Sequence, residues 1–236
     1  MSQPLRLALI GASKIAHKIT PALQALSVHI KIAGIASSSI ERARTFCKTH
    51  ALPKVYTSYD EALRSPDVDA VYISLLNKDH YELSKQALLA GKHVLCEKPL
   101  ALKHAHALEL AQIAEQKSLV LQEGLMYRFH PDYLHLTELV KSGQLGRVHS
   151  IRASFLFQMD TQNSARRKKY SGGGAAADLG CYLIDFANSV AALTGDHALP
   201  QIIAHAQFAQ NDPDSVDQKT VIHLSYPSGL TALLDT

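Results

Sequence analysis

The sequence predicts an α/β protein in which an open parallel sheet is followed by an α+β domain with a mainly antiparallel sheet. Two observations lead to this prediction. Short apolar runs alternate with helical patterns up to residue 122, whereas after Gly124 longer strand-like runs follow one another. Strands that alternate with helices pair in parallel, and strands joined by turns pair antiparallel. The 236 residues suffice for two domains, which we place at 1–123 and 124–236.

The first domain consists of short apolar runs separated by helical segments. The run 5–10 ends at Gly11 and is apolar enough to be buried on both faces of a sheet. Apolar positions recur with helical spacing in 15–26, and Gly91 ends a helical segment before the run 93–96. The expected strands are 5–10, 30–36, 55–56, 70–74, 93–96 and 119–122, and the expected helices are 15–26, 40–50, 59–63, 80–90 and 102–117.

The second domain is expected to combine two helices with a sheet. The segment 147–158 is rich in β-branched and aromatic residues, and an apolar helix at 175–194 is followed by Gly195. Pro227-Ser228-Gly229 is a turn, so the strand at 230–234 should return antiparallel to the strand before it. The expected helices are 131–142 and 175–194, and the expected strands are 147–158, 202–208, 220–226 and 230–234.

The chain stops directly after the last expected strand, at Asp235-Thr236. Natural domains seldom leave an apolar strand uncovered, because unpaired edges promote aggregation. Either this strand is a true edge, or the sequence is shortened and the sheet is incomplete. We expect the second case and treat the domain 124–236 as truncated.

Composition argues against several classes of function. The net charge of +3 is small and dispersed, so we expect neither a nucleic-acid partner nor a membrane surface. We find no apolar stretch of 18 residues and no signal-peptide pattern. Three scattered cysteines fit the reduced thiols of a cytoplasmic protein, and we expect no metal site.

The segment Gly11-Ala12-Ser13-Lys14-Ile15 lies between the first strand and the first helix, where a dinucleotide-binding fold holds the pyrophosphate. Such a site needs a glycine for the turn and backbone N–H groups at a helix N-terminus. Ser13 replaces the second glycine of the usual pattern, and it could cap the helix or donate to a phosphate. We assign Gly11, Ser13, Lys14 and Ile15 to a cofactor site. The alternative is a tight turn without a ligand.

The end of the second strand favours NADP over NAD. A carboxylate there would accept from the adenosine ribose and repel a 2′-phosphate. The sequence Ala36-Ser37-Ser38-Ser39 has no carboxylate, and Arg42 follows closely. We assign Ser37, Ser38 and Arg42 to the cofactor site and keep NAD as the second possibility. An ordinary solvated turn is the alternative.

Two further strand ends supply cofactor-site candidates, because ligands bind at the carboxyl edge of a parallel sheet. Leu76, Asn77 and His80 follow one strand, and Glu97 and Lys98 follow the next. His80 could equally well be a structural residue at the start of a helix. We assign all five residues to the cofactor site.

Lys98, Asp178 and Tyr182 form the candidate catalytic set. Asp178 and Tyr182 are four residues apart on an expected helix and so share a face. Hydride transfer at a C–O centre needs an acid or base at the oxygen. Tyr182 could donate that proton while the Lys98 ammonium polarises the same oxygen. A capping carboxylate and a buried phenol are the structural alternative.

Several motifs together resemble the Gfo/Idh/MocA oxidoreductases. The resemblance covers essentially the whole chain and implies a Rossmann domain, a substrate domain, nicotinamide chemistry, and a sugar, polyol or diol substrate. The motifs are Ala90-Gly91-Lys92-His93-Val94, Glu97-Lys98-Pro99, Arg128-Phe129-His130-Pro131 and Gly172-Gly173-Gly174 leading into Asp178-Leu179-Gly180-Cys181-Tyr182.

The resemblance also implies roles for single residues. Lys98 is the catalytic lysine, and Asp178 binds or orients the substrate. Tyr182, where many members carry histidine, is the acid–base, similar to the branch of glucose–fructose oxidoreductase, xylose dehydrogenase and dihydrodiol dehydrogenase. A homo-oligomer is implied for the full-length form, because the sheet of the second domain commonly serves as an interface.

Two functional hypotheses remain open. The first is an NADP-preferring reductase or dehydrogenase of sugars or diols. The second is a non-catalytic nucleotide-binding regulatory protein or an inactive shortened member, because the family also includes a transcriptional repressor. The basic run Arg166-Arg167-Lys168-Lys169 is interpreted as a solvated loop, with an anion clamp for the substrate as the alternative.

Overall fold

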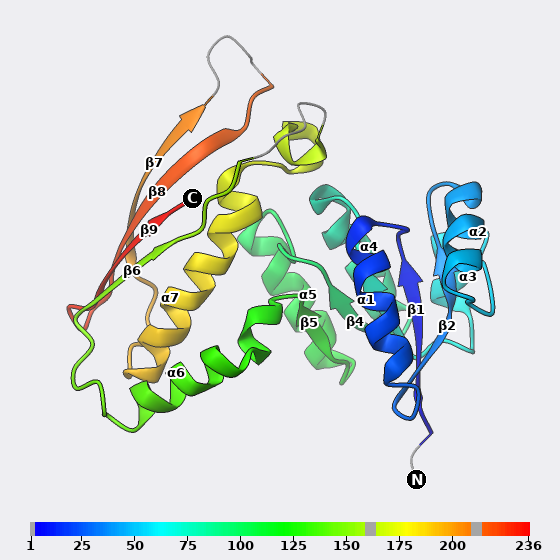
Figure 1. Cartoon of the computed structure of the whole chain (residues 1–236), viewed down its shortest axis with the longest axis horizontal. Helices are drawn as coiled ribbons and strands as arrows, with labels where there is room; N and C mark the ends of the chain where they lie inside the picture. Colours follow the sequence, from blue (N-terminus) through cyan, green and yellow to red (C-terminus); the bar gives the residue numbers. More distant parts are fainter. Residues whose placement is uncertain (1–2, 159–163, 209–213) are drawn as a thin grey trace. The chain divides into compact units, whose positions relative to one another are not determined.

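The computed structural model of the chain describes residues 3–158, 164–208 and 214–236. It divides into two compact units, Met1–Gly124 and Leu125–Thr236 (Figure 1). Each unit has its own sheet and its own hydrophobic core, so each is described by itself.

The sheet of the first unit is parallel, with the strand order β2-β1-β3-β4-β5. This arrangement confirms the predicted α/β class. The strands are β1 (Leu5–Ile10), β2 (Ile30–Ala36), β3 (Ala70–Ile73), β4 (His93–Cys96) and β5 (Leu121–Glu123), and the helices are α1 (Lys14–Ala25), α2 (Ile40–Thr49), α3 (Tyr59–Arg64), α4 (Asn77–Leu89) and α5 (His104–Gln116).

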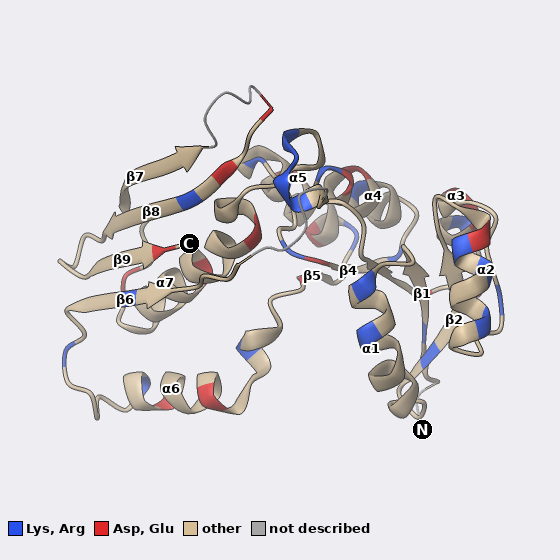
Figure 2. Cartoon of the chain, turned by 45° about the horizontal axis from the view of Figure 1, so that its top comes forward, with Lys and Arg blue, Asp and Glu red and all other residues tan. Residues whose placement is uncertain are grey.

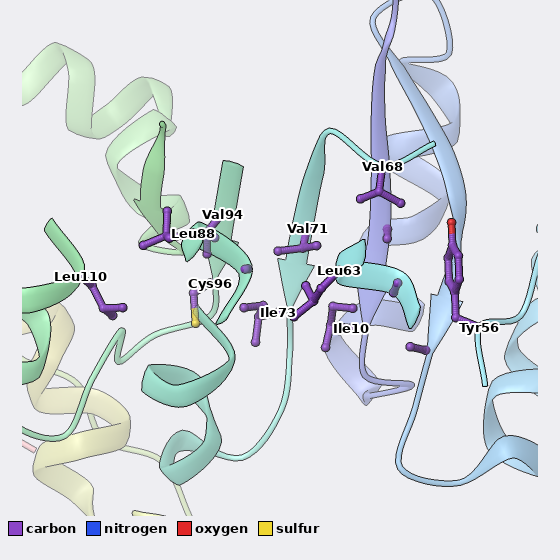
Figure 3. Close-up of a cluster of buried hydrophobic side chains, with 14 of the residues drawn as sticks. Ile10, Tyr56, Leu63, Val68, Val71, Ile73, Leu88, Val94, Cys96 and Leu110 are labelled. Carbon is purple, nitrogen blue, oxygen red and sulfur yellow. The ribbon is translucent and has the colours of Figure 1, made fainter. Parts of the chain in front are cut away.

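Alternate residues of the strands supply two cores, one on each face of the sheet. Ala8 and Ile10 pack with residues of α4 and α5, including Leu88, in the cluster drawn in Figure 3. Leu7 and Leu9 pack with residues of α1 and α2. All of these side chains are buried. Because helices cover both faces of the sheet, β1 is apolar at the successive positions 7–10. This apolar run is the pattern from which the sequence predicted the strand.

Several predicted bounds of the first unit differ from the structure by one or two residues; the last strand, expected at 119–122, is Leu121–Glu123. Two predicted elements differ more. The expected strand at 55–56 is only an isolated parallel bridge between Val55 and Ile35, because two residues are too few for a repeating ladder. The helix expected to begin at residue 80 begins at Asn77. Asp79 in its first turn interacts favourably with the partial positive charge of the helix N-terminus.

The second unit packs helix α7 against a sheet with the order β6-β9-β8-β7. The β6–β9 pair is parallel and the other two pairs are antiparallel, which confirms a mainly antiparallel sheet. Its elements are a 3₁₀ turn (Met126–Phe129), α6 (Pro131–Lys141), β6 (Ser150–Ser154), a π-helical turn (Ala176–Gly180), α7 (Cys181–Leu193), β7 (Gln201–Phe208), β8 (Asp217–Ser225) and β9 (Thr231–Asp235).

The last strand is not an edge strand. β9 pairs antiparallel with β8, as the turn at 227–229 predicted, and on its other side it pairs in parallel with β6. Ala232 and Leu234 of β9 are themselves fully buried. The alternative that this strand is a true edge is therefore wrong. The pairing with β6 joins segments far apart in the chain, and no local pattern reveals it.

Charged residues of both signs are interspersed along the elements of both units (Figure 2). Within the described parts of the chain, no helix has the length and apolar character needed to cross a membrane. None of the three cysteines, Cys47, Cys96 and Cys181, forms a disulfide in the part of the chain that the structure describes.

Candidate active site

Gly11 makes the turn between β1 and α1. Its φ is +110°, and a Cβ built there would lie 2.8 Å from the backbone oxygen of Ser74 and 2.9 Å from the side chain of Leu75. Its N–H donates to the carbonyl oxygen of Ala36 at 2.8 Å. Only glycine combines this dihedral angle with this close approach. The turn therefore lies directly against the carboxyl ends of β2 and β3.

Ser13 caps helix α1, which is one of the two roles that the sequence suggested. Its Oγ accepts a hydrogen bond from the N–H of Ala16 at 3.0 Å and donates to the Oγ of Ser74 at 2.9 Å. Lys14 and Ile15 begin the helix. The first backbone N–H groups of an α-helix have no acceptor within the helix and carry partial positive charge. The turn therefore fits a pyrophosphate group.

Ser37, Ser38 and Arg42 lie at the end of β2. The Nη2 of Arg42 donates to the Oγ of Ser38 at 2.7 Å. Ser39 caps α2 by accepting from the backbone N–H of Arg42 at 3.3 Å. Ser37 is buried, whereas Arg42 is exposed. An exposed guanidinium held beside a hydroxyl is a donor set suited to a phosphate on the ribose.

His80 is fully buried and has a carbonyl oxygen beside each ring nitrogen. Its Nδ1 lies 2.8 Å from the oxygen of Pro99, and its Nε2 lies 3.3 Å from the oxygen of Leu75. The ring thus ties α4 to the loop after β4, which is the structural role that the sequence left open. Leu76 and Asn77 are the N-cap and the first residue of the same helix.

Carboxylates at two strand ends fix the loop that carries Lys98. The Oε1 of Glu97 accepts from the hydroxyl of Tyr72 at 2.8 Å, and the Oε1 of Glu123 accepts from the N–H of Leu100 at 2.8 Å. Burial and the neighbouring Glu97 charge raise the pKa of Tyr72 far above its ordinary value, so its hydroxyl remains a donor. Lys98 is half-buried, and the peptide bond after it is cis. The lysine therefore lies on fixed backbone at the carboxyl edge of the sheet.

Asp178 lines a cavity of about 270 Å³ within the second unit. The residue is 6% exposed, and its Oδ2 lies 3.4 Å from the Nε of Arg166. Phe157, Arg167 and Asp217 also line the cavity. The cavity thus combines two guanidinium groups, two carboxylates and an aromatic ring.

The helix that carries Asp178 and Tyr182 is not the continuous α-helix predicted for 175–194. Ala176–Gly180 is a π-helical turn, and α7 begins at Cys181. In a π turn each N–H bonds to the carbonyl five residues earlier, so one residue is inserted relative to an α-helix. A spacing of four therefore no longer places the two side chains directly above one another. The apolar pattern alone cannot distinguish this turn from an α-helix.

The ring of Tyr182 lies among aromatic side chains of the second unit. Its centroid is 5.7 Å from the Phe155 ring and 6.2 Å from the Tyr127 ring. Tyr127 also contacts Tyr133 at 5.0 Å. Tyr182 therefore has two aromatic neighbours, Phe155 and Tyr127, within the distance range of ring–ring contacts.

A charged network that sequence reasoning missed fixes the 3₁₀ turn beside Tyr182. Asp185 accepts from the Tyr127 hydroxyl and from two nitrogens of Arg128, with an Nε–Oδ2 distance of 2.8 Å. The Arg128 guanidinium also donates to the Oγ of Ser189 at 3.0 Å. Hydrogen bonding to Asp185 raises the pKa of Arg128. Burial raises the pKa of Tyr127 above its ordinary value.

The partners in this network are too far apart in the chain for a local pattern to join them. Arg128 belongs to one of the recognised motifs, but Asp185 lies 57 residues further on. Arg166 was considered for the site only as part of the basic run, with an anion clamp for the substrate as the alternative role, and Asp217 was not predicted as a site residue. The basic run marked Arg166 as charged, but nothing in the sequence indicated its contact with Asp178.

Two family models match the chain. An oxidoreductase family with an NAD-binding Rossmann fold matches residues 5–125, and the GFO/IDH/MocA C-terminal domain matches residues 133–236. The chain belongs to the Gfo/Idh/MocA oxidoreductase family. The predictions of this family, of its Rossmann domain and of an NAD(P)-dependent oxidoreductase are thereby confirmed.

Known members of the family are similar over most of this chain. Trans-1,2-dihydrobenzene-1,2-diol dehydrogenase of Xenopus tropicalis is 31% identical over 229 residues, which are 97% of this chain and 67% of that protein. A dTDP-3,4-didehydro-2,6-dideoxy-alpha-D-glucose 3-reductase of Actinomadura kijaniata is 35% identical over 184 residues, 78% of this chain and 55% of that protein.

A crystal structure of a longer chain has a similar fold. A 3-ketoreductase from Actinomadura kijaniata, in complex with NADP and TDP-benzene, matches with a TM-score of 0.88 and 31% identity. The match covers 99% of this chain and 70% of that one. The chain thus spans about two thirds of the length of such relatives.

Proposed function

We propose that this protein transfers a hydride between NADP, in preference to NAD, and a C–O carbon of a sugar, a polyol or a trans-diol. The observation that carries the proposal is the loop of Lys98, a lysine at the carboxyl edge of a parallel sheet on backbone fixed by Glu97 and Glu123. The named activities of the relatives, a diol dehydrogenase and a sugar 3-reductase, support this substrate class.

The first unit supplies groups that fit each part of the cofactor. The turn at Gly11 and the capped N-terminus of α1 suit the pyrophosphate. The Arg42 guanidinium, held by Ser38, suits a 2′-phosphate and supports NADP over NAD. When bound, the nicotinamide supplies or accepts the hydride.

In this proposal Tyr182 is the acid–base. During reduction of a carbonyl its hydroxyl donates a proton to the substrate oxygen. The Lys98 ammonium stabilises the negative charge that develops on the same oxygen. The carboxylate of Asp178 accepts a hydrogen bond from a substrate hydroxyl and so orients the reacting carbon. Oxidation runs through the same proton transfer in reverse.

Turnover of two substituted proteins tests the proposal. Tyr182→Phe and Lys98→Met should each lower kcat at least about 100-fold, as expected for losing an acid–base or polarising group. Tyr170→Phe and Lys103→Met are matched controls, because both residues are exposed. Wild-type turnover in both Tyr182→Phe and Lys98→Met would rule out the mechanism.

The second candidate function predicts a different result for the unsubstituted chain. A nucleotide-binding regulatory protein should bind NADPH and yet show no turnover with aldoses, ketoses or diols. Because a fold alone does not determine activity, this panel is needed alongside the substituted proteins. NADPH binding without turnover over the whole panel would favour regulation over catalysis.

A further inference from the structure

Arg166 makes a contact that the proposed mechanism does not use. Its Nε lies 3.4 Å from the Oδ2 of Asp178, and the two side chains are 56% and 9% exposed, respectively. The ion pair therefore joins a buried carboxylate to a guanidinium that reaches solvent. Removing one partner of a buried pair leaves a poorly compensated charge, so Arg166 stabilises the carboxylate in its present position.

The glycines before the helix bond through their backbone to the loop that carries Arg166. The N–H of Gly174 donates to the carbonyl oxygen of Arg166 at 2.9 Å, and the N–H of Gly173 donates to that of Lys168 at 3.1 Å. A Cβ at Gly173 would collide with the Arg166 carbonyl group, and Gly174 has a φ of +123°. The chain can return this closely only without side chains. The glycines thus fix the backbone from which Arg166 reaches Asp178.

Arg166 and the helical segment that carries Asp178 each make one further contact that restrains them. The guanidinium carbon of Arg166 lies 5.9 Å from the centre of the Phe157 ring, within the range of a cation–π contact. Asp217 fixes the start of the helical segment that carries Asp178, because its Oδ2 accepts from the N–H of Ala176 at 2.7 Å. These contacts limit the movement of the guanidinium and of the helix.

We propose that Arg166 is a positioning residue, which holds the Asp178 carboxylate at the cavity wall so that it can accept a hydrogen bond from a substrate hydroxyl. The proposal rests on the proposed function, because it uses Asp178 as the group that orients the substrate. It also names the ligand chemistry of the cavity. Because the guanidinium groups of Arg166 and Arg167 are matched in number by the carboxylates of Asp178 and Asp217, the cavity suits a neutral hydroxyl-bearing group rather than a carboxylate or a phosphate.

A double-mutant cycle tests this role. The cycle compares the wild type with Arg166→Met, Asp178→Asn and the double variant, and it measures kcat, KM and NADPH affinity for each. Each single substitution should lower kcat/KM without changing NADPH affinity, and the double variant should lose little more than Asp178→Asn alone. Coupling between contacting residues corresponds to about 2-fold to 150-fold in kcat/KM. Lys169→Met, an exposed residue of the same basic run, is the control.

Chemical rescue adds a readout that general destabilisation would not produce. Guanidinium ion at millimolar concentration should restore part of kcat/KM in Arg166→Ala and none in Asp178→Asn, and Arg166→Lys should keep part of the activity. Additive losses in the cycle, or an equal loss in Lys169→Met, would overturn the positioning role.

The same cycle measured by urea unfolding is independent of turnover. Coupling between Arg166 and Asp178 in the free energy of unfolding is expected even when no substrate is supplied, and its absence would overturn the proposal. Wild-type kinetics in Asp178→Asn would overturn the substrate role of Asp178, and with it the positioning role. Losses in Asp178→Asn without coupling would overturn the positioning role alone.

Discussion

Asp185 should be one of the residues on which the second unit depends most. Its side chain is 18% exposed and its partner Arg128 is 42% exposed. Asp185 accepts three hydrogen bonds, one from Tyr127 and two from Arg128. Hydrogen bonds to charged groups contribute about 1.5–3 kcal/mol each and are not additive. Allowing for the solvent around Arg128, we expect Asp185→Ala to lower the free energy of unfolding by about 2–4 kcal/mol.

Urea unfolding followed by near-ultraviolet circular dichroism measures this loss, because the chain has nine tyrosines and no tryptophan. The midpoint should fall while the slope with urea stays unchanged. Glu138→Ala is the control: Glu138 is 72% exposed and pairs with Lys141 at 3.5 Å, so its loss should cost about 0.5 kcal/mol or less. Equal midpoints for Asp185→Ala and Glu138→Ala would refute the reasoning.

Three further predictions concern the first unit. Gly11→Ala should lower the free energy of unfolding by about 1–3 kcal/mol and weaken NADPH binding, because a Cβ at a φ of +110° meets neighbouring backbone. Urea unfolding measures the loss of stability, and nucleotide titration measures the loss of affinity. Arg42→Met should weaken NADPH binding about tenfold or more and leave NADH binding unchanged. The control is Arg44→Met, because Arg44 is also exposed. An equal loss of affinity for both nucleotides would contradict this prediction. Hydrogen bonding to Arg6 holds the pKa of Asp69 at about 2, below its ordinary value. The stability that this pair contributes is therefore present at neutral pH and lost as the pH falls from about 4 toward 2. Asp69→Asn should thus be less stable than the wild type at pH 7, and this difference should shrink toward zero as the pH falls through 2. A constant difference across this range would contradict the assignment.

The sequence was most informative where structure depends on neighbouring residues. The strands β1, β2 and β4 were predicted with the bounds that the structure has, because strands covered on both faces are apolar at successive positions. The cap at Ser13 likewise follows from its residue type and place. These local features also suffice to place the candidate cofactor residues at the carboxyl edge of the sheet.

Features that depend on distant residues could not be predicted. The parallel pairing of β6 with β9, the Asp185 network and the contact of Arg166 with Asp178 each join segments that no local pattern relates. The π turn at Ala176–Gly180 is different, because its residues are equally compatible with an α-helix. It lies between the three glycines and α7, and it changes the angle between Asp178 and Tyr182 that a regular helix would have given.

The hydride transfer itself tests the central claim most directly. NADPH carrying deuterium in both C4 positions of the nicotinamide is incubated with the 236-residue chain and a panel of ketoses, ketosugars and diketones, and the products are analysed by mass spectrometry. The account predicts one deuterium on a carbinol carbon of a product, formed at least about 100-fold more slowly by Tyr182→Phe. Bound NADPH, shown by a raised unfolding temperature, with no deuterium in any product would contradict it.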